Sequence, residues 1–199
     1  MEKPAETQQP IHEIIARRWS PRAIDPDRSV SRETLISLLE AARWAPSSGN
    51  EQPWRYLVFD RGNPEALEKA WDCLSQGNAW ARKAPLLLLS VAKNNRARND
   101  QPNRHAQHDT GLASENLVLL AVALGLVAHQ MAGFDSARAR EAFAIPDEHT
   151  PMAMIAIGYA GNVEDLPPDL QERENAPRSR KPLSEIAFSA RWDTPPDAT

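Results

Sequence analysis

Cysteine is almost absent from this 199-residue sequence, which contains only Cys73. A single cysteine excludes an intrachain disulfide, and no reactive signature surrounds it, so we expect an inert thiol. The N-terminal segment lacks the basic start and apolar stretch of a signal peptide, and we therefore expect a cytoplasmic protein. The longest apolar runs, residues 85–92 and 117–128, are too short to span a bilayer, so no membrane association is expected.

Several enzyme signatures are also missing. The sequence has no G-x-S-x-G, no P-loop and no G-x-G-x-x-G, which removes the standard hydrolase, NTPase and Rossmann classes. The formal net charge of −4 argues against general binding to nucleic acid, because such binding needs a concentrated basic surface. Arginine is abundant, however, with 18 residues against 5 lysines. Two tight clusters stand out, RRWSPR at residues 17–22 and RSRK at residues 178–181.

Periodic segments along the chain predict alternating helices and strands. Ser31 is a good N-cap for a helix with an apolar stripe formed by Leu35, Leu38, Leu39 and Ala42. The apolar run at 85–92 is typical of a central strand covered on both faces. Further predicted elements are helices at 10–18, 64–74, 109–125 and 136–144, strands at 56–59 and 152–159, and a polar loop at 93–104 that could act as a lid.

This alternation indicates an α/β or α+β sandwich. We expect a single domain over residues 10–190, with flexible tails at 1–9 and 191–199. The helix predicted at 109–125 is almost wholly apolar, which implies that it is buried all round or lies at a subunit interface.

The segment APSSGNEQPWR, residues 45–55, is unusually rich in residues that break regular structure. Pro and Gly interrupt helices and strands, while Ser and Asn side chains hydrogen-bond to nearby backbone. The mixture predicts a fixed polar loop. Such loops often bind ligands, although an ordinary turn is the commoner explanation.

The two arginine clusters admit two interpretations. Arg18 and Arg22, with the Ser20 hydroxyl between them, could hold a phosphate monoester, because the guanidinium fork matches phosphate oxygens. A solvated basic face paired with surface carboxylates is the alternative. Arg178 and Arg180 strengthen the phosphate hypothesis only if folding brings the chain ends together, which is common in domains.

Two further segments carry weaker signals. In QMAGFD, residues 130–135, Gly133 could let the backbone approach a ligand closely, or could simply belong to a turn. His105 and His108 have helical spacing, but no third metal ligand is suggested elsewhere. We therefore expect no metal site and interpret this segment as a helix start, with Asp109 or Thr110 as the cap.

Taken together, these segments resemble the nitroreductase family of FMN-dependent oxidoreductases. The match runs through RRWSPR, AARWAPSSGNEQPWRYLVF, KAPLLLLSV, HDTGLASENLVLLAVALGL, AGFD, MAMIAIGYAG and RSRKPLSEI, in the family's order. It covers residues 11 to about 187. The resemblance implies an α+β fold with a central mixed sheet flanked by helices, in an intertwined homodimer with FMN at the interface.

The resemblance also implies which residues bind FMN. The phosphate would be held by Arg18, Ser20, Arg22, Arg178 and Arg180, with Arg17 as an alternative in the ambiguous register of the arginine pair. The loop would reach into the partner's site with Pro46, Ser47, Ser48 and Asn50. Ala132 and Gly133 match the turn whose backbone N–H groups face the flavin, although many relatives have an acidic residue in place of Ala132. Gln52 and Trp54 are interpreted as supports of the loop.

The implied function is that of an NAD(P)H-dependent flavin oxidoreductase. NAD(P)H would give a hydride to the flavin in a ping-pong cycle, and a nitroaromatic, quinone or activated alkene would then accept the electrons. The flavin carries the chemistry, so no catalytic side chain is expected. Two alternatives stay open, a non-catalytic FMN-binding protein and a family branch with another reaction, such as reductive dehalogenation or an oxygen-dependent one.

Overall fold

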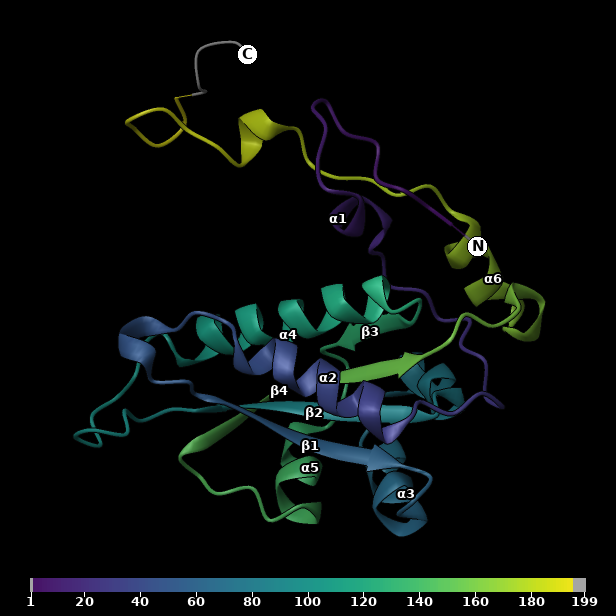
Figure 1. Ribbon diagram of the computed structural model, residues 1–199, viewed down its shortest axis with the longest axis horizontal. Coiled ribbons are helices and arrows are strands. Elements are labelled where there is room, and N and C mark those ends of the chain that lie inside the picture. Colours follow the sequence, from purple (N-terminus) through teal and green to yellow (C-terminus); the bar gives the residue numbers. More distant parts are fainter. Residues whose placement is uncertain (1, 195–199) are drawn as a thin grey trace.

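Four strands form one sheet in the computed structural model, which describes residues 2–194 (Figure 1). Their order across the sheet is β1-β2-β4-β3. The strands are β1 (Trp54–Asp60), β2 (Leu86–Lys93), β3 (Val127–Met131) and β4 (His149–Gly158). With the helices described below, the expected α+β sandwich is confirmed. Part of the predicted C-terminal tail, residues 195–199, lies outside the described residues.

The sheet is antiparallel at all three pairings, in place of the expected mixed sheet. β2 and β3 do run in the same direction, because helix α4 (Ala106–Ala123) connects them across the sheet. β4 lies between these two strands and runs opposite to both. β1 and β4 likewise run in the same direction on either side of β2, so within the described strands no two parallel strands are hydrogen-bonded to each other.

Helices cover both faces of the sheet (Figure 1). One face carries α2 (Arg32–Arg43) and α4, and the other carries α3 (Pro64–Asp72), α5 (Ser136–Ala142) and the 3-10 segment η2 (Gln76–Lys83). The remaining elements are α1 (Glu13–Arg17), η1 (Ser48–Asn50), η3 (Val163–Asp165), α6 (Pro168–Asn175) and η4 (Leu183–Glu185). In residues 2–194, no helix combines the length and the apolar character needed to cross a membrane.

Strand β2 is buried on both faces, as its apolar run predicts. Leu86 and Leu88 pack in the cluster formed with α2 and α4, whereas Leu87 and Leu89 pack in the cluster formed with α3 and η2. All four side chains are at most 2% exposed. Each face of the central strand thus anchors one helical layer.

The two chain ends lie side by side and form an arm over α4, made of residues 2–18 and 176–194 (Figure 1). The Lys3 ammonium donates to the carbonyls of Glu174 and Ala176, and the Ala5 N–H donates to the Ala16 carbonyl at 2.8 Å. The predicted N-terminal tail, residues 1–9, has no helix or strand in its described part. It is nevertheless attached at these points.

Gly161 allows two backbone segments to approach closely. A Cβ at this position would lie 2.8 Å from the Ile24 carbonyl carbon and 2.9 Å from the Asp25 nitrogen. Both are backbone atoms, so Gly161→Ala is expected to lower the free energy of unfolding by about 1 to 3 kcal/mol, measured by urea denaturation. Gly77→Ala is the control, because a Cβ there meets nothing within 4 Å. Equal stability of the two variants would contradict this packing.

Candidate functional site

A buried carboxylate fixes the first arginine segment, which follows α1. Glu174 of α6 is 0% exposed, and its Oε1 accepts from the Arg22 N–H at 2.7 Å and the Ala23 N–H at 3.2 Å. Its Oε2 lies 3.6 Å from the Arg22 guanidinium. Helix α6 near the C-terminus therefore sets the backbone and one side chain of a segment near the N-terminus.

The second arginine segment joins the first through Arg178. Its guanidinium donates to three carbonyls, those of Lys3 at 2.6 Å, Ala16 at 2.8 Å and Arg18 at 2.9 Å. Burial, followed by the charges of Arg18 and Arg180, lowers the pKa of Arg178. Folding therefore brings the chain ends together, which is the condition under which Arg178 and Arg180 strengthen the phosphate hypothesis. We call Arg18, Arg22, Arg178 and Arg180 the arginine cluster.

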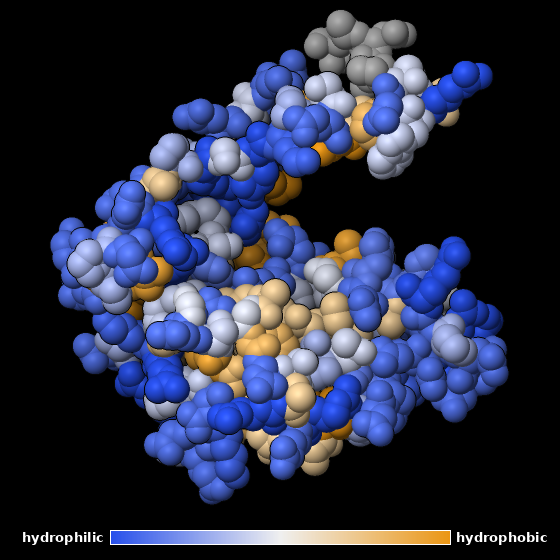
Figure 2. Space-filling view, turned by 180° about the vertical axis from the view of Figure 1, so that it is seen from behind, coloured by the Kyte–Doolittle hydropathy of each residue, from blue (hydrophilic) through white to orange (hydrophobic). Residues whose placement is uncertain are grey.

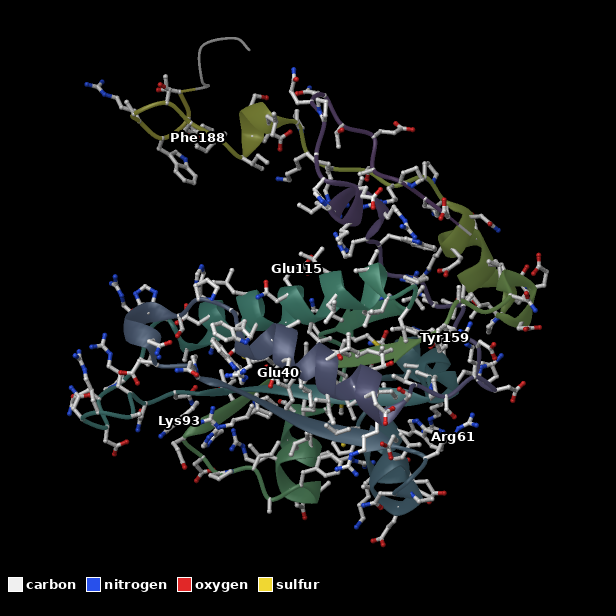
Figure 3. The ribbon with its side chains drawn as sticks, viewed as in Figure 1. Glu40, Arg61, Lys93, Glu115, Tyr159 and Phe188 are labelled. Carbon is white, nitrogen blue, oxygen red and sulfur yellow. The ribbon has the colours of Figure 1, made fainter. Side chains whose placement is uncertain are left out.

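Arg17 and Arg18 have different surroundings. The Arg17 side chain is 48% exposed and pairs with Glu2 at 3.8 Å. The Arg18 side chain is 23% exposed and lies 3.6 Å from Glu115, which projects from the middle of α4 toward the arm (Figure 3). Ser20 is half-buried two residues further on. Of the two, Arg18 is therefore the one directed into the space between arm and helix.

His129 of β3 contacts the backbone of the first arginine segment. Its Nδ1–H donates to the Pro21 carbonyl at 3.1 Å, and its ring lies 4.8 Å from the Trp80 ring. Burial, with a smaller contribution from the Arg22 charge, lowers the pKa of His129 from 6.5 to about 4. The folded protein therefore holds this imidazole in its neutral form.

This pKa predicts an acid-sensitive stability. Between pH 6.5 and about 4, the unfolded chain binds a proton at His129 that the folded chain does not. The free energy of unfolding should therefore fall by about 3 kcal/mol as the pH drops through this window. His129→Gln keeps a donor for the Pro21 carbonyl and should remove that component, measured by urea denaturation at pH 7.0 and pH ~4.5. An unchanged pH dependence in the variant would refute the assignment.

The turn after β3 presents unpaired backbone donors. The Gly133 carbonyl accepts from the Ser75 N–H at 3.1 Å and from the Asn78 side-chain amide at 2.9 Å. Within residues 2–194, the N–H groups of Ala132 and Gly133 meet no acceptor. A Cβ at Gly133 would lie 2.6 Å from Asn78 Nδ2, so the missing side chain leaves room for this brace. Two N–H groups are thus available to a ligand.

The loop predicted as fixed has an unusual backbone. Gly49, Asn50 and Gln52 all have positive φ, at 60°, 57° and 48°. The Ser47 hydroxyl accepts from the Gln52 N–H at 3.0 Å, and the Gln52 amide donates to the Asn50 carbonyl at 3.0 Å. Gln52 is therefore a brace, as predicted, and the buried Trp54 anchors the following strand. Asn50, Ser48 and Pro46 remain exposed at the loop surface.

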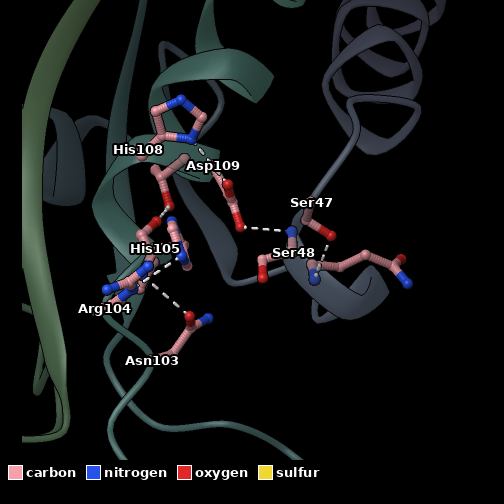
Figure 4. Close-up of polar contacts among 10 residues, drawn as sticks. Ser47, Ser48, Asn103, Arg104, His105, His108 and Asp109 are labelled. Carbon is pink, nitrogen blue, oxygen red and sulfur yellow. Dashed lines mark hydrogen bonds and ion pairs between the residues drawn. The ribbon is translucent and has the colours of Figure 1, made fainter.

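The expected capping role of Asp109 is wrong. Helix α4 begins at Ala106, three residues earlier than predicted, and neither Asp109 nor Thr110 is its cap. The Asp109 carboxylate instead accepts from the Ser48 N–H at 2.9 Å and lies 2.9 Å from His108 Nδ1 (Figure 4). A carboxylate that is 3% exposed thus ties the loop to the first turn of α4.

The structure brings some of the predicted residues together and separates others. The arginine segment and the Ala132–Gly133 turn both lie at the β3 edge, because His129 of β3 contacts Pro21. The loop at residues 46–50 precedes β1, the opposite edge of the sheet. At about 4.8 Å per strand, roughly 14 Å of sheet separates these edges. Within one chain, the two groups of predicted residues therefore lie at opposite edges of the sheet.

Comparison with known proteins identifies the family to which this chain belongs. The nitroreductase family model matches residues 15–159. The chain belongs to the nitroreductase family. Among its relatives, the DrgA protein of Synechocystis is 30% identical over 200 residues, covering 87% of this chain and 93% of DrgA. The major NAD(P)H-flavin oxidoreductase of Aliivibrio fischeri is 41% identical over 51 residues, covering 26% of this chain and 23% of that protein.

Solved structures agree with the family assignment. An oxidoreductase containing FMN has a TM-score of 0.88 and 34% sequence identity, with coverage of 94% of this chain and 95% of that one. In this nitroreductase-family chain, the supports that sequence analysis missed are Glu174, His129, Asn78 and the loop-tying role of Asp109. An Asn beside a Gly and an isolated His inside an apolar strand are weak signals, and nothing in QEREN marks its last Glu as buried.

Proposed function

We propose that this chain is an FMN-dependent NAD(P)H oxidoreductase. The observation that carries the proposal is the arginine cluster, which lies at the same sheet edge as the two unpaired N–H groups of Ala132 and Gly133. A phosphate and a polar ring edge on one ligand match these two features. The structural relative described as an oxidoreductase containing FMN and the NAD(P)H-flavin oxidoreductase relative support this reading.

The residues present fit FMN. Arg18, Ser20, Arg22 and Arg180 would hold the phosphate, while Arg178, committed to three carbonyls, fixes the segments that carry them. Burial, and after it the charges of Arg18 and Arg180, lower the pKa of Arg178, and an anion would relieve the charge repulsion within the cluster. Bound flavin would supply hydride acceptance and release. The N–H groups at residues 132–133 would orient the ring and stabilise negative charge on it.

The part of each FMN site formed by the loop at residues 46–50 would come from another copy of the chain. Pro46, Ser47, Ser48 and Asn50 lie at the opposite sheet edge from the arginine cluster, so they would complete the site of a partner subunit. The space-filling view shows a hollow between the arm and the body, with hydrophobic side chains along it (Figure 2). Apolar side chains exposed on the arm are Ile11, Ile15, Leu183, Ile186 and Trp192. A homodimer would cover this surface.

Flavin content and its reduction test the proposal. The purified protein should show flavin absorption bands, and anaerobic NADH or NADPH should bleach them. Adding a nitroaromatic, a quinone or an activated alkene should then restore the absorbance if that class is the acceptor. Absence of bound or bindable FMN would refute the cofactor assignment. Bound FMN that neither nucleotide bleaches would instead indicate a flavin-binding protein without turnover.

A further inference from the structure

The loop between β2 and α4 carries arginines that are not neutralised. Arg96, Arg98 and Arg104 form no ion pair with any carboxylate in the described part of the chain. Other exposed arginines do pair, such as Arg43 with Glu40 at 2.6 Å. In a chain of net charge −4, three unpaired arginines within nine positions concentrate positive charge. We call residues 94–104 the basic loop.

The basic loop has a fixed backbone. An isolated bridge joins Asn95 to Pro102, and the Arg96 N–H donates to the Gln101 carbonyl at 2.8 Å. The Asn103 N–H donates to the Asn94 carbonyl at 2.7 Å. The loop is therefore a short hairpin, and its side chains project outward beyond Lys93 at the end of β2 (Figure 3). A fixed backbone limits the entropy lost when its arginines bind a ligand.

The hairpin is attached directly to the proposed flavin loop. The Ala97 N–H, between two of the arginines, donates to the Glu51 carboxylate at 2.8 Å. Glu51 immediately follows Asn50. At the base of the hairpin, Arg104 lies in the same cluster as Asp109, which holds the Ser48 N–H (Figure 4). Both ends of the basic loop are thus fixed beside residues 46–50.

The two nearby carboxylates accept from amide N–H groups and do not pair with the arginines of the basic loop. Glu51 accepts from the Ala97 backbone, and Asp100 accepts from the Asn95 amide at 3.2 Å. His105 Nε2 accepts from Arg104 Nε at 3.1 Å. The three guanidinium groups of the basic loop outnumber these two carboxylates, so positive charge exceeds negative charge here and an anion would meet donors in a fork geometry.

From this arrangement we propose that Arg96, Arg98 and Arg104 form a subsite for the 2′-phosphate of NADPH, and that the protein prefers NADPH to NADH. The inference rests on the proposed function. The 2′-phosphate sits on the adenosine, far from the nicotinamide that must reach the flavin. A subsite for it should therefore lie outside the ring-binding part of the site but connected to it, and the basic loop, bonded to Glu51 next to residues 46–50, is in such a place.

Steady-state kinetics with the two nucleotides test the subsite. The intact protein should have kcat/KM at least about tenfold higher for NADPH than for NADH. Arg96→Gln, Arg98→Gln and Arg104→Gln should each lower kcat/KM for NADPH about threefold to tenfold, mainly through KM, with NADH unchanged within about twofold. Arg32→Gln, on an exposed position at the far end of α2, is the matched control. As a readout independent of turnover, 2′,5′-ADP should compete more strongly than 5′-AMP, and this difference should shrink in the variants.

The results distinguish failure of the 2′-phosphate subsite from failure of the proposed function. Equal losses for NADPH and NADH, no loss, a preference for NADH, or a loss of bound FMN in the variants would each overturn the subsite. Failure of the proposed function looks different, because the flavin would then be reduced by dithionite but by neither nucleotide.

Discussion

Replacing Glu174 by alanine is expected to lower the free energy of unfolding by about 3 to 5 kcal/mol, the largest stability effect that the structure predicts for a single polar residue. The substitution removes the acceptor of the Arg22 and Ala23 N–H groups and leaves the Arg22 guanidinium without its partner. Urea denaturation at neutral pH measures the loss.

Glu172→Ala is the matched control for this result. It removes an exposed carboxylate from the same helix, so the free energy of unfolding should change by less than about 0.5 kcal/mol. Glu174→Gln keeps one acceptor and should fall between the two. If Glu174→Ala were as stable as Glu172→Ala, the buried carboxylate would not be holding the arginine segment.

FMN affinity should depend most strongly on two arginines together. Each charge-assisted bond to a phosphate contributes about 1.5 to 3 kcal/mol, so the Arg18→Ala/Arg180→Ala double variant should weaken FMN binding by about 3 to 6 kcal/mol if the two act independently. Neither side chain holds a buried group, so the fold should persist. Fluorescence titration of FMN into the apoprotein measures the change.

Arg17→Ala provides the comparison for the double variant. Its side chain faces Glu2 on the exposed side, so FMN affinity should stay within about twofold of the original. A large loss of FMN affinity in Arg17→Ala, with little change in the double variant, would show that Arg17 and not Arg18 binds the phosphate.

Capping residues and apolar periodicity in the sequence predicted several helices and strands correctly. Ser31 does cap α2, its hydroxyl accepting from the Thr34 N–H at 3.1 Å, and the apolar run at 85–92 does form the doubly covered strand. Strand β3 was missed because its first two residues, Val127 and Ala128, belong to an apolar run that began in α4, and only three residues of the strand follow that run. The break between them is Gly125, with φ of 75°, and a single glycine inside such a run is a weak stop signal.

The supports of the site depend on contacts between distant residues. Asp109 was interpreted as a cap because only its neighbours are visible in sequence, whereas its partner Ser48 lies 61 positions away. Glu174 follows three other charged or polar residues, and only the packing of α6 on the arginine segment buries it. The arginine cluster and the loop were recognised through family resemblance. Their supports could not be, because burial and partner choice are set by the tertiary fold.

The junction of the chain ends has a consequence for biosynthesis. The ribosome makes Arg18 and Arg22 among the first residues, but Glu174 and Arg178, which fix them, emerge near the end. A chain that terminates before Glu174 contains every strand of the sheet and still lacks an ordered arginine cluster. Such a product is expected to remain unable to retain the cofactor, so cofactor loading would mark chains whose synthesis is essentially complete.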